Sequence, residues 1–176
     1  MQLAVIGTGY VGLVSGVCFS EFGFRVTCVD KDSDKIAKLQ QHIMPIYEPG
    51  LEQLVESNRK AGRLSFSTDL AQAVANADIV FIAVGTPSGE SGMPDLSALH
   101  AVAKDVAKAV SKYTLVVVKS TVPVATNRAL AKMMSEANPD ADFDIASNPE
   151  FLREGAAIKD FMSPDRIVAG IDSKAA

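Results

Sequence analysis

Three glycines within six residues, placed directly after a short apolar run, constrain the fold of this chain more than any other feature. The apolar run covers residues 3–6, and the pattern G-x-G-x-x-G follows it at residues 7–12, ahead of a stretch with helical periodicity. Gly7 permits a tight turn, Gly9 lets a ligand approach the backbone, and Gly12 allows close packing of helix on strand. The pattern predicts a strand–turn–helix unit that binds a dinucleotide.

An acidic residue at the end of the second apolar run supports this interpretation. Asp30 follows the run at residues 25–29. A carboxylate at this place accepts hydrogen bonds from the adenosine ribose, while the N-terminus of the first helix attracts the diphosphate. Asp30 also repels a 2′-phosphate, so NAD is favoured over NADP. Lys31 and Lys35 are close enough in the sequence to weaken that preference.

Short apolar runs alternate with helix-length segments along the rest of the chain. Strands are expected at residues 3–6, 25–29, 64–67, 79–84, 115–118 and 144–147, with one more at 166–170. Helices are expected from the glycine turn to residue 22, and at residues 33–41, 51–62, 69–76, 99–110 and 124–137. Asp32 or Ser33 is expected to cap the second helix, and Gly23 to end the first. Helical crossovers predict right-handed βαβ units. The expected fold is therefore α/β: a doubly wound (Rossmann), mainly parallel sheet with helices on both faces, in a single domain over residues 1–176.

Composition excludes several classes of protein. A chain of 176 residues is long enough for one sizeable domain, and its formal net charge of −4 argues against a nucleic-acid partner. The sequence lacks the layout of a signal peptide and an apolar run long enough for a membrane span, so a cytoplasmic location is expected. Its cysteines, Cys18 and Cys28, and its histidines, His42 and His100, do not have the spacing of a metal site, so no metal is expected.

Polar residues follow three later strands, and parallel strands end at one edge of a sheet. The residues expected to converge there, near the nicotinamide end of a dinucleotide, are Thr86, Ser120, Thr121, Asn148, Glu150 and Glu154. An alternative is that prolines end these strands and hydroxyls cap helices, and for Ser120 and Pro123 both interpretations are equally good. Both cysteines are expected to be small buried apolar residues, and both histidines to lie on the surface.

Six motifs together resemble the UDP-glucose/GDP-mannose dehydrogenase family over essentially the whole chain. They are G-T-G-Y-V-G at 7–12, E-P-G-L at 48–51, V-G-T-P at 84–87, S-T-V-P at 120–123, N-P-E-F-L-R-E-G at 148–155 and D-F-M-S-P-D-R-I-V at 160–168. The last motif is more similar to the UDP-glucose branch than to the GDP-mannose branch. The resemblance implies oxidation of the C6 alcohol of UDP-glucose to UDP-glucuronate in two hydride transfers to NAD, through a cysteine thioester.

The resemblance also implies roles for individual residues. Those expected to contact NAD are Gly7, Gly9, Tyr10, Val11, Gly12, Asp30, Lys35, Thr86, Thr121 and Glu154. The segment expected to line the nucleotide-sugar is Glu150, Phe151, Leu152, Arg153 and Glu154. Thr121 and Glu154 would position a water near the reacting carbon, and Glu150 would act as general base in thioester hydrolysis.

In the resembling family, the nucleophilic cysteine, the residues that stabilise the oxyanion and most uridine contacts lie beyond the part that matches this chain. The central helix through which the family forms a homodimer or a higher oligomer lies there too. The chain alone is therefore expected to be inactive. Two alternatives stay open: a dehydrogenase of GDP-mannose or of a UDP-N-acetyl sugar, and a stand-alone NAD-binding module that acts as a sensor or partner protein.

Overall fold

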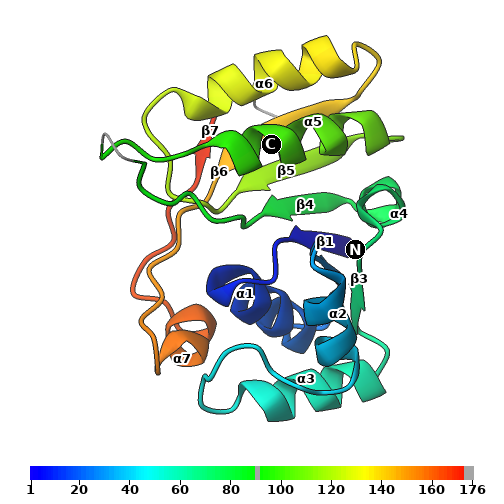
Figure 1. Ribbon diagram of the computed structural model, residues 1–176, viewed down its shortest axis with the longest axis vertical. Helices are drawn as coiled ribbons and strands as arrows, with labels where there is room; N and C mark the ends of the chain where they lie inside the picture. The colour runs from blue at the N-terminus through cyan, green and yellow to red at the C-terminus, as the bar shows by residue number, and fades with distance from the viewer. Residues whose placement is uncertain (90–91, 173–176) are drawn as a thin grey trace.

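The structure, a computed structural model, describes residues 1–89 and 92–172, and this part of the chain forms seven strands and seven helices (Figure 1). They alternate along the chain except between the second and third strands, where two helices follow each other. The strands are β1 (Gln2–Ile6), β2 (Arg25–Val29), β3 (Leu64–Ser67), β4 (Ile79–Ile82), β5 (Thr114–Val118), β6 (Phe143–Ser147) and β7 (Gly170–Ile171). The helices are α1 (Tyr10–Glu21), α2 (Ser33–Gln40), α3 (Leu51–Lys60), α4 (Leu70–Asn76), α5 (Ser97–Ala109), α6 (Thr126–Ala137) and α7 (Ala157–Met162).

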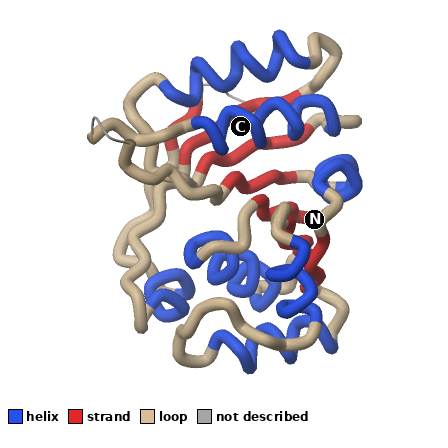
Figure 2. The backbone as a smooth tube through the Cα atoms, viewed as in Figure 1, coloured by secondary structure: helices blue, strands red, loops and turns tan. Residues whose placement is uncertain are grey.

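The strands form one sheet in the order β3-β2-β1-β4-β5-β6-β7 (Figure 2). The first six strands are parallel, and β7 pairs antiparallel with β6. The strand order reverses between β1 and β4, which is where folds of this kind bind their ligands, outside the carboxyl ends of the strands. The predicted doubly wound, single-domain α/β fold is confirmed.

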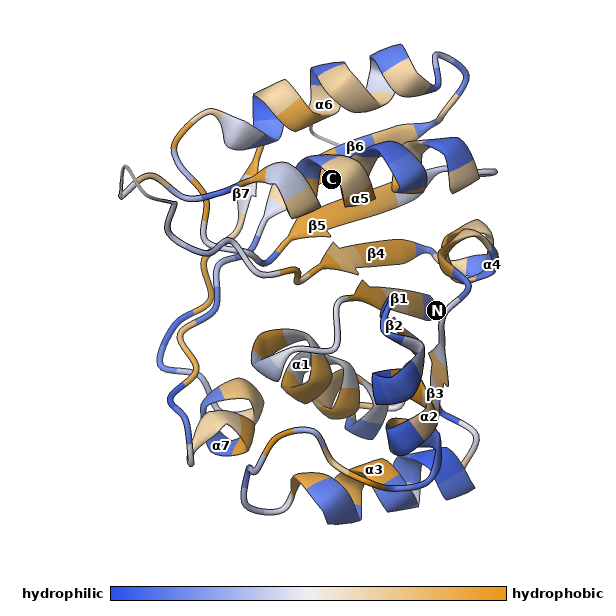
Figure 3. Ribbon diagram, viewed as in Figure 1, coloured by the Kyte–Doolittle hydropathy of each residue, from blue (hydrophilic) through white to orange (hydrophobic). Residues whose placement is uncertain are grey.

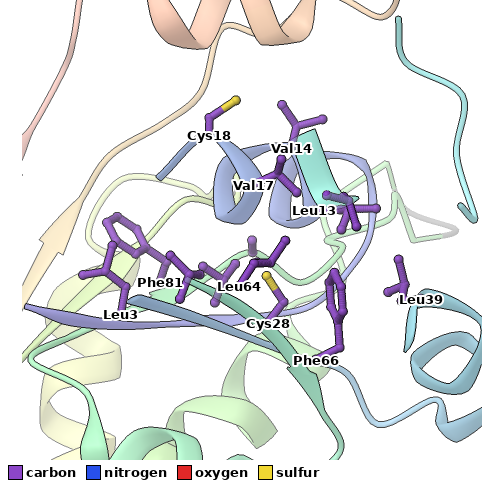
Figure 4. Packing of buried hydrophobic residues seen from close by; sticks show 14 of the residues in the cluster. Leu3, Leu13, Val14, Val17, Cys18, Cys28, Leu39, Leu64, Phe66 and Phe81 are labelled. Atoms are coloured by element: carbon purple, nitrogen blue, oxygen red, sulfur yellow. The ribbon is translucent and has the colours of Figure 1, made fainter. Parts of the chain in front are cut away.

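The sheet separates two hydrophobic cores, because successive strand residues point to opposite faces. On one face, Leu3 and Val5 of β1 pack with apolar residues of α1, α2 and α3 (Figure 4). On the other face, Ala4 and Ile6 pack with α4, α5 and α6. Residues 79–82 of β4 and 115–118 of β5 are accordingly all apolar and contribute to both cores, and both strands are coloured as mainly hydrophobic in Figure 3.

Helix α1 lies unusually close to the sheet because two of its residues have no side chain. A Cβ atom at Gly12 would lie 2.0 Å from the carbonyl oxygen of Gly7, and one at Gly16 would lie 2.4 Å from Cys28 Sγ. Cys18 and Cys28 are free and buried, as expected. Burial raises the pKa of each thiol to about 12, so both stay neutral.

Caps at two predicted positions are confirmed. The side chain of Asp32 accepts a hydrogen bond of 3.0 Å from Lys35 N at the start of α2. Gly23, directly after the end of α1, has the positive φ of 96° that a helix-terminating glycine adopts.

The chain departs from the expected elements mainly at its C-terminal end. The strand predicted at 79–84 ends at Ile82, and the short helix α7 was not expected. The strand predicted at 166–170 is wrong for most of its length, since only Gly170 and Ile171 pair with β6. At Gly170 a Cβ atom would meet Ser147 Oγ at 2.4 Å, so the missing side chain permits the close approach.

The second and third glycines of the motif allow a matched test of the packing of α1. Gly12→Ala should destabilise the protein by about 3 kcal/mol, because the two atoms nearest to the new Cβ are backbone atoms of Gly7 and cannot move aside. Gly9→Ala should cost about 1 kcal/mol or less, since an added Cβ at Gly9 has no neighbour within 4 Å. Urea unfolding measures both free energies. Equal losses of unfolding free energy in the two variants would show that the packing of α1 does not depend on the close approach of Gly12 to Gly7.

Candidate functional site

The segments that follow β1, β4, β5 and β6 lie side by side along one edge of the sheet. Each is tied to its neighbour by a backbone hydrogen bond one residue beyond the strand. These bonds run from Gly7 N to Val29 O (2.7 Å), Ala83 N to Ile6 O (2.9 Å), Lys119 N to Ile82 O (2.9 Å) and Asn148 N to Val118 O (2.9 Å). The three polar loops predicted from the sequence therefore begin at the same edge as the glycine turn.

The glycine turn leaves the N-terminus of α1 open. Gly7 adopts a φ of 101°, which turns the chain sharply out of β1. Gly9 is the N-cap of α1 and supplies no side-chain hydrogen bond to the helix. The first backbone N–H groups of α1 thus have no intrahelical acceptor, and no atom would lie within 4 Å of a Cβ at Gly9. This end of α1 can receive an anionic group such as a diphosphate.

Asp30 is held next to the glycine turn by four hydrogen bonds. Its Oδ2 accepts from Thr8 N (2.9 Å), Thr8 Oγ1 (2.7 Å) and Lys35 Nζ (3.0 Å), and its Oδ1 accepts from Asp32 N (3.1 Å). Burial alone would raise the pKa of Asp30, but these hydrogen bonds outweigh burial and lower the pKa to about 2. Asp30 is therefore a charged acceptor at neutral pH, with acceptor capacity remaining on Oδ1.

The contact between Thr8 and Asp30 was not predicted from the sequence. Thr8 is buried, and both its backbone N–H and its hydroxyl bind Asp30. The only signal was its place as the variable residue between Gly7 and Gly9. The contact fixes the distance between the open end of α1 and the carboxylate after β2.

The loops after β4 and β5 are joined to each other. Thr86 Oγ1 donates to Thr121 O at 3.2 Å, so these two predicted site residues are brought together. Ser120 Oγ donates to Val84 O at 2.6 Å, which gives this hydroxyl a structural role between the loops. Thr121 itself is exposed at the edge of the sheet.

The segment after β6 carries the predicted catalytic carboxylates. Glu150 Oε2 accepts a hydrogen bond of 2.6 Å from Leu152 N, which bends the segment back on itself. Arg153 forms a two-pronged ion pair with Asp160, with distances of 2.9 and 2.6 Å. Glu154 is exposed. The backbone of this segment is thus fixed at several points, as a surface for a rigid ligand requires.

The contacts of the Asn148 side chain differ from those that the sequence predicted. Its side-chain amide was expected to face the ligand, but Oδ1 accepts from Lys119 Nζ at 2.9 Å and Nδ2 donates to Val168 O at 2.9 Å. Both ends of the amide are therefore used to fix the chain. Its position next to β7 explains this, because the returning segment presents a carbonyl at hydrogen-bonding distance.

Lys119 is a buried cation that the sequence did not predict. Only 4% of the residue is exposed, and its ammonium lies 5.8 Å from the centre of the Phe161 ring. Burial lowers the pKa of Lys119, and the nearby charge of Glu150 opposes that change. A lysine at the end of a strand usually reaches solvent, so only the tertiary structure reveals this position.

Glu48 was noted in the sequence only as part of a motif, yet it is a second buried charge at this site. The residue is 5% exposed. Its carboxylate accepts hydrogen bonds from the Tyr10 hydroxyl, from Gly155 N (2.8 Å) and from Ala157 N (2.9 Å). Burial favours a higher pKa for Glu48, but these donors outweigh it and lower the pKa below its usual value.

A mainly apolar groove of about 640 Å³ extends from the segment after β6 along β4, β5 and β6, on the α1 side of the sheet. Glu150, Phe151 and Leu152, all predicted to line the substrate, border it together with Lys119. The floor of the groove is made by Ile79, Phe81, Leu115, Val117 and Ala146. The segment after β6 therefore lies between the polar edge of the sheet and an apolar surface.

Metal ligation and membrane insertion find no support in residues 1–89 and 92–172. Within these ranges, no group of three histidine, cysteine or acidic side chains could hold a metal ion. No helix there combines the length and apolarity that crossing a bilayer needs. His42 and His100 are both exposed, as expected.

Comparison with known proteins identifies relatives for the whole chain. Residues 1–176 match the family described as "UDP-glucose/GDP-mannose dehydrogenase family, NAD binding domain". The chain is 56% identical to the UDP-glucose 6-dehydrogenase of Rhizobium meliloti over 98% of its own length and 40% of that protein's. It is 48% identical to the UDP-glucose 6-dehydrogenase TuaD of Bacillus subtilis, over 98% of the chain and 38% of the relative. The chain thus spans about two fifths of the length of these relatives.

Solved structures of two dehydrogenases have the same fold as this chain. A UDP-glucose dehydrogenase from Pyrobaculum islandicum superposes with a TM-score of 0.95 at 43% identity, over 99% of this chain and 41% of that one. A GDP-mannose dehydrogenase from Pseudomonas aeruginosa superposes with a TM-score of 0.95 at 40% identity, over 99% and 42%. The glycine turn, the acid after β2 and the match over all 176 residues lead to one conclusion: this chain belongs to the UDP-glucose/GDP-mannose dehydrogenase family, whose NAD-binding domain it matches.

Proposed function

We propose that the chain is the cofactor-binding part of an NAD-dependent UDP-glucose 6-dehydrogenase. The observation that carries the proposal is the placement of Asp30, a charged acceptor that Thr8 holds beside the open N-terminus of α1. A diphosphate and the adjoining ribose need these two features, at this separation along a sheet edge. The 56% identity to the Rhizobium meliloti enzyme supports UDP-glucose as the substrate.

The residues of the site fit NAD. The first N–H groups of α1 and the open space at Gly9 would hold the diphosphate. Asp30 and Lys35 would hold the adenosine ribose, and Asp30 would disfavour the 2′-phosphate of NADP. Thr86, Thr121 and Glu154 would contact the nicotinamide end, at the edge where the loops after β4, β5 and β6 begin. When bound, NAD supplies a hydride acceptor to the reaction.

The segment after β6 would bind the nucleotide-sugar and assist its chemistry. The backbone of residues 150–154 would line the sugar, with its conformation held by the Glu150–Leu152 hydrogen bond. Thr121 and Glu154 would position a water molecule near C6, and Glu150 would act as general base when that water hydrolyses the thioester. Glu150 is suited to the role, because it lies beside a buried cation and borders an apolar groove.

The nucleophile of the complete enzyme would come from outside residues 1–176. Cys18 and Cys28 are both buried, and burial raises their pKa values to about 12. A thiol in this state is neither ionised nor accessible, whereas thioester formation needs a thiolate that reaches the substrate. Formation of a homodimer or higher oligomer by the complete enzyme is part of the same proposal.

A GDP-mannose dehydrogenase is the second candidate. The GDP-mannose dehydrogenase from Pseudomonas aeruginosa superposes with the same TM-score of 0.95 as the UDP-glucose dehydrogenase from Pyrobaculum islandicum. Steady-state rates of the complete protein with UDP-glucose, GDP-mannose and a UDP-N-acetyl sugar separate the candidates. The gene sequence beyond codon 176 separates all of them from a stand-alone NAD-binding module.

Replacing Asp30 tests the cofactor site. Asp30→Ala removes a charged acceptor for the ribose hydroxyls and should weaken NAD binding by roughly 1.5–3 kcal/mol, which is roughly 10- to 150-fold. Isothermal titration calorimetry measures the affinity. Asp105→Ala, which removes an exposed carboxylate on α5, is the matched control and should leave the affinity unchanged. Unchanged affinity in Asp30→Ala would remove Asp30 from the site.

The charge on Asp30 should also stabilise the fold in a pH-dependent way. Its pKa is lowered from 3.8 to about 2 in the folded chain, so its contribution is complete above about pH 4 and is lost as the pH falls toward 2. The stability difference between the native protein and Asp30→Asn should shrink by about 1 kcal/mol between pH 7 and pH 3. Urea unfolding at the two pH values measures it, and a constant difference would contradict the assignment.

The isolated chain should bind NAD without oxidising UDP-glucose. Both cysteines are buried and neutral, so no thiolate is available to capture an aldehyde at C6. In the resembling family most uridine contacts also lie beyond the part that matches this chain, so UDP-glucose should not be held against NAD even for the first hydride transfer. Calorimetry should detect NAD binding, and NADH absorbance should stay constant when UDP-glucose is added. Sustained NADH formation by residues 1–176 alone would refute the proposal that groups essential for catalysis come from outside these residues.

A further inference from the structure

The Glu48 carboxylate joins three segments that lie far apart in the sequence. Tyr10 belongs to the glycine turn, Glu48 precedes α3, and Gly155 and Ala157 lie at the end of the segment after β6. All three donors are neutral, and the ion pairs of the described residues do not include Glu48. A buried charge held only by hydrogen bonds is costly when one donor is lost, so the contacts depend on one another.

On the cofactor side, the link is Tyr10. Tyr10 is the first residue of α1, so its backbone lies in the helical turn whose N–H groups face the proposed diphosphate site. Its side chain points to the other segment: the hydroxyl donates to Glu48 and lies 3.4 Å from Arg153 O. Burial first, and then the hydrogen bond to Glu48, raise the pKa of Tyr10 to about 12, so the hydroxyl keeps its proton as a donor.

On the substrate side, the link is the backbone of Gly155 and Ala157. Gly155 has a φ of 83°, which lets the chain turn its N–H toward Glu48 Oε2, while Ala157 N binds Oε1 at the start of α7. These bonds anchor the end of the segment that carries Glu150 and Glu154. Its other end is anchored through Asn148 and Lys119.

We propose that Glu48 is a positioning residue that couples cofactor binding at α1 to the ordering of residues 148–157, which bind the nucleotide-sugar. The inference rests on the proposed function, because it assumes that the diphosphate occupies the end of α1. A ligand that fixes the backbone of Tyr10 also fixes its hydroxyl, and through Glu48 it restrains Gly155 and Ala157. Linkage makes the effect reciprocal: a restrained segment favours the cofactor by the same factor.

Amide hydrogen exchange of the chain, followed residue by residue by NMR, tests the coupling. Addition of saturating NAD should slow exchange at Gly155 and Ala157 by about fivefold or more. Tyr10→Phe removes the hydroxyl but keeps the backbone N–H groups of α1, and with NAD at a concentration that saturates this variant, as calorimetry measures it, the added protection should disappear. If the contact between Tyr10 and Glu48 were merely structural, its loss would speed exchange equally with and without NAD. The ratio of the two exchange rates would then be the same as in the native chain.

A neighbouring tyrosine provides the matched control. Tyr47 is 87% exposed and precedes Glu48 in the chain, so Tyr47→Phe removes a hydroxyl without touching the carboxylate. Its NAD-dependent protection should equal that of the native chain. Glu48→Gln, which keeps the shape of the side chain but removes its charge, should lose the protection as Tyr10→Phe does.

The outcomes separate this inference from the proposed function. If the native chain does not bind NAD, the proposed function itself fails. If NAD binds but exchange at Gly155 and Ala157 does not change, the coupling is refuted and the cofactor site stands. Persistence of the full protection in Tyr10→Phe would also overturn the inference. Should Glu48→Gln fail to fold, Tyr10→Phe alone decides the question.

Discussion

The close approach of α1 to the turn before it is the constraint on which the rest of the site depends. A Cβ at Gly12 would lie only 2.0 Å from Gly7 O, so any other residue would force the helix away from β1. With α1 in place, its open N-terminus meets the edge where four parallel strands end. Thr8 then links that edge to Asp30, so one backbone contact determines how the two proposed sites, for the diphosphate and for the ribose, lie relative to each other.

The fold could be predicted from the sequence because its signals are local. Strand and helix periodicity, the glycine motif and the caps at Asp32 and Gly23 each act within a few residues, and the structure confirms them. The short β7 escaped this reasoning because its position depends on β6. Residues 167–169 carry apolar side chains typical of a strand, but Ile167 is 76% exposed and the backbone there does not pair in a ladder.

The candidate site could be predicted only in part, because several of its contacts join residues that lie far apart in the sequence. The convergence of the loops that carry Thr86, Thr121 and Glu150 could be predicted because parallel strands end at one edge of the sheet. The burial of Lys119 and Glu48 could not be predicted, since burial of a charge depends on partners distant in the chain. Right-handed crossovers place α5 and α6 on the opposite face of the sheet, so β5 and β6 keep an apolar face beside the segment that follows β6. Lys119 borders this apolar face and is 4% exposed.

The contacts of Glu48 also bear on how the chain folds. Its hydrogen bonds to Gly155 and Ala157 close loops of 107 and 109 residues, and closing loops of this length costs more entropy than forming β1–α1–β2. Contacts at long sequence separation slow folding and tend to form after local units. The β1–α1–β2 unit can therefore assemble before residues 148–157 dock. The last part of the protein to acquire its native contacts would then be the segment proposed to bind the sugar.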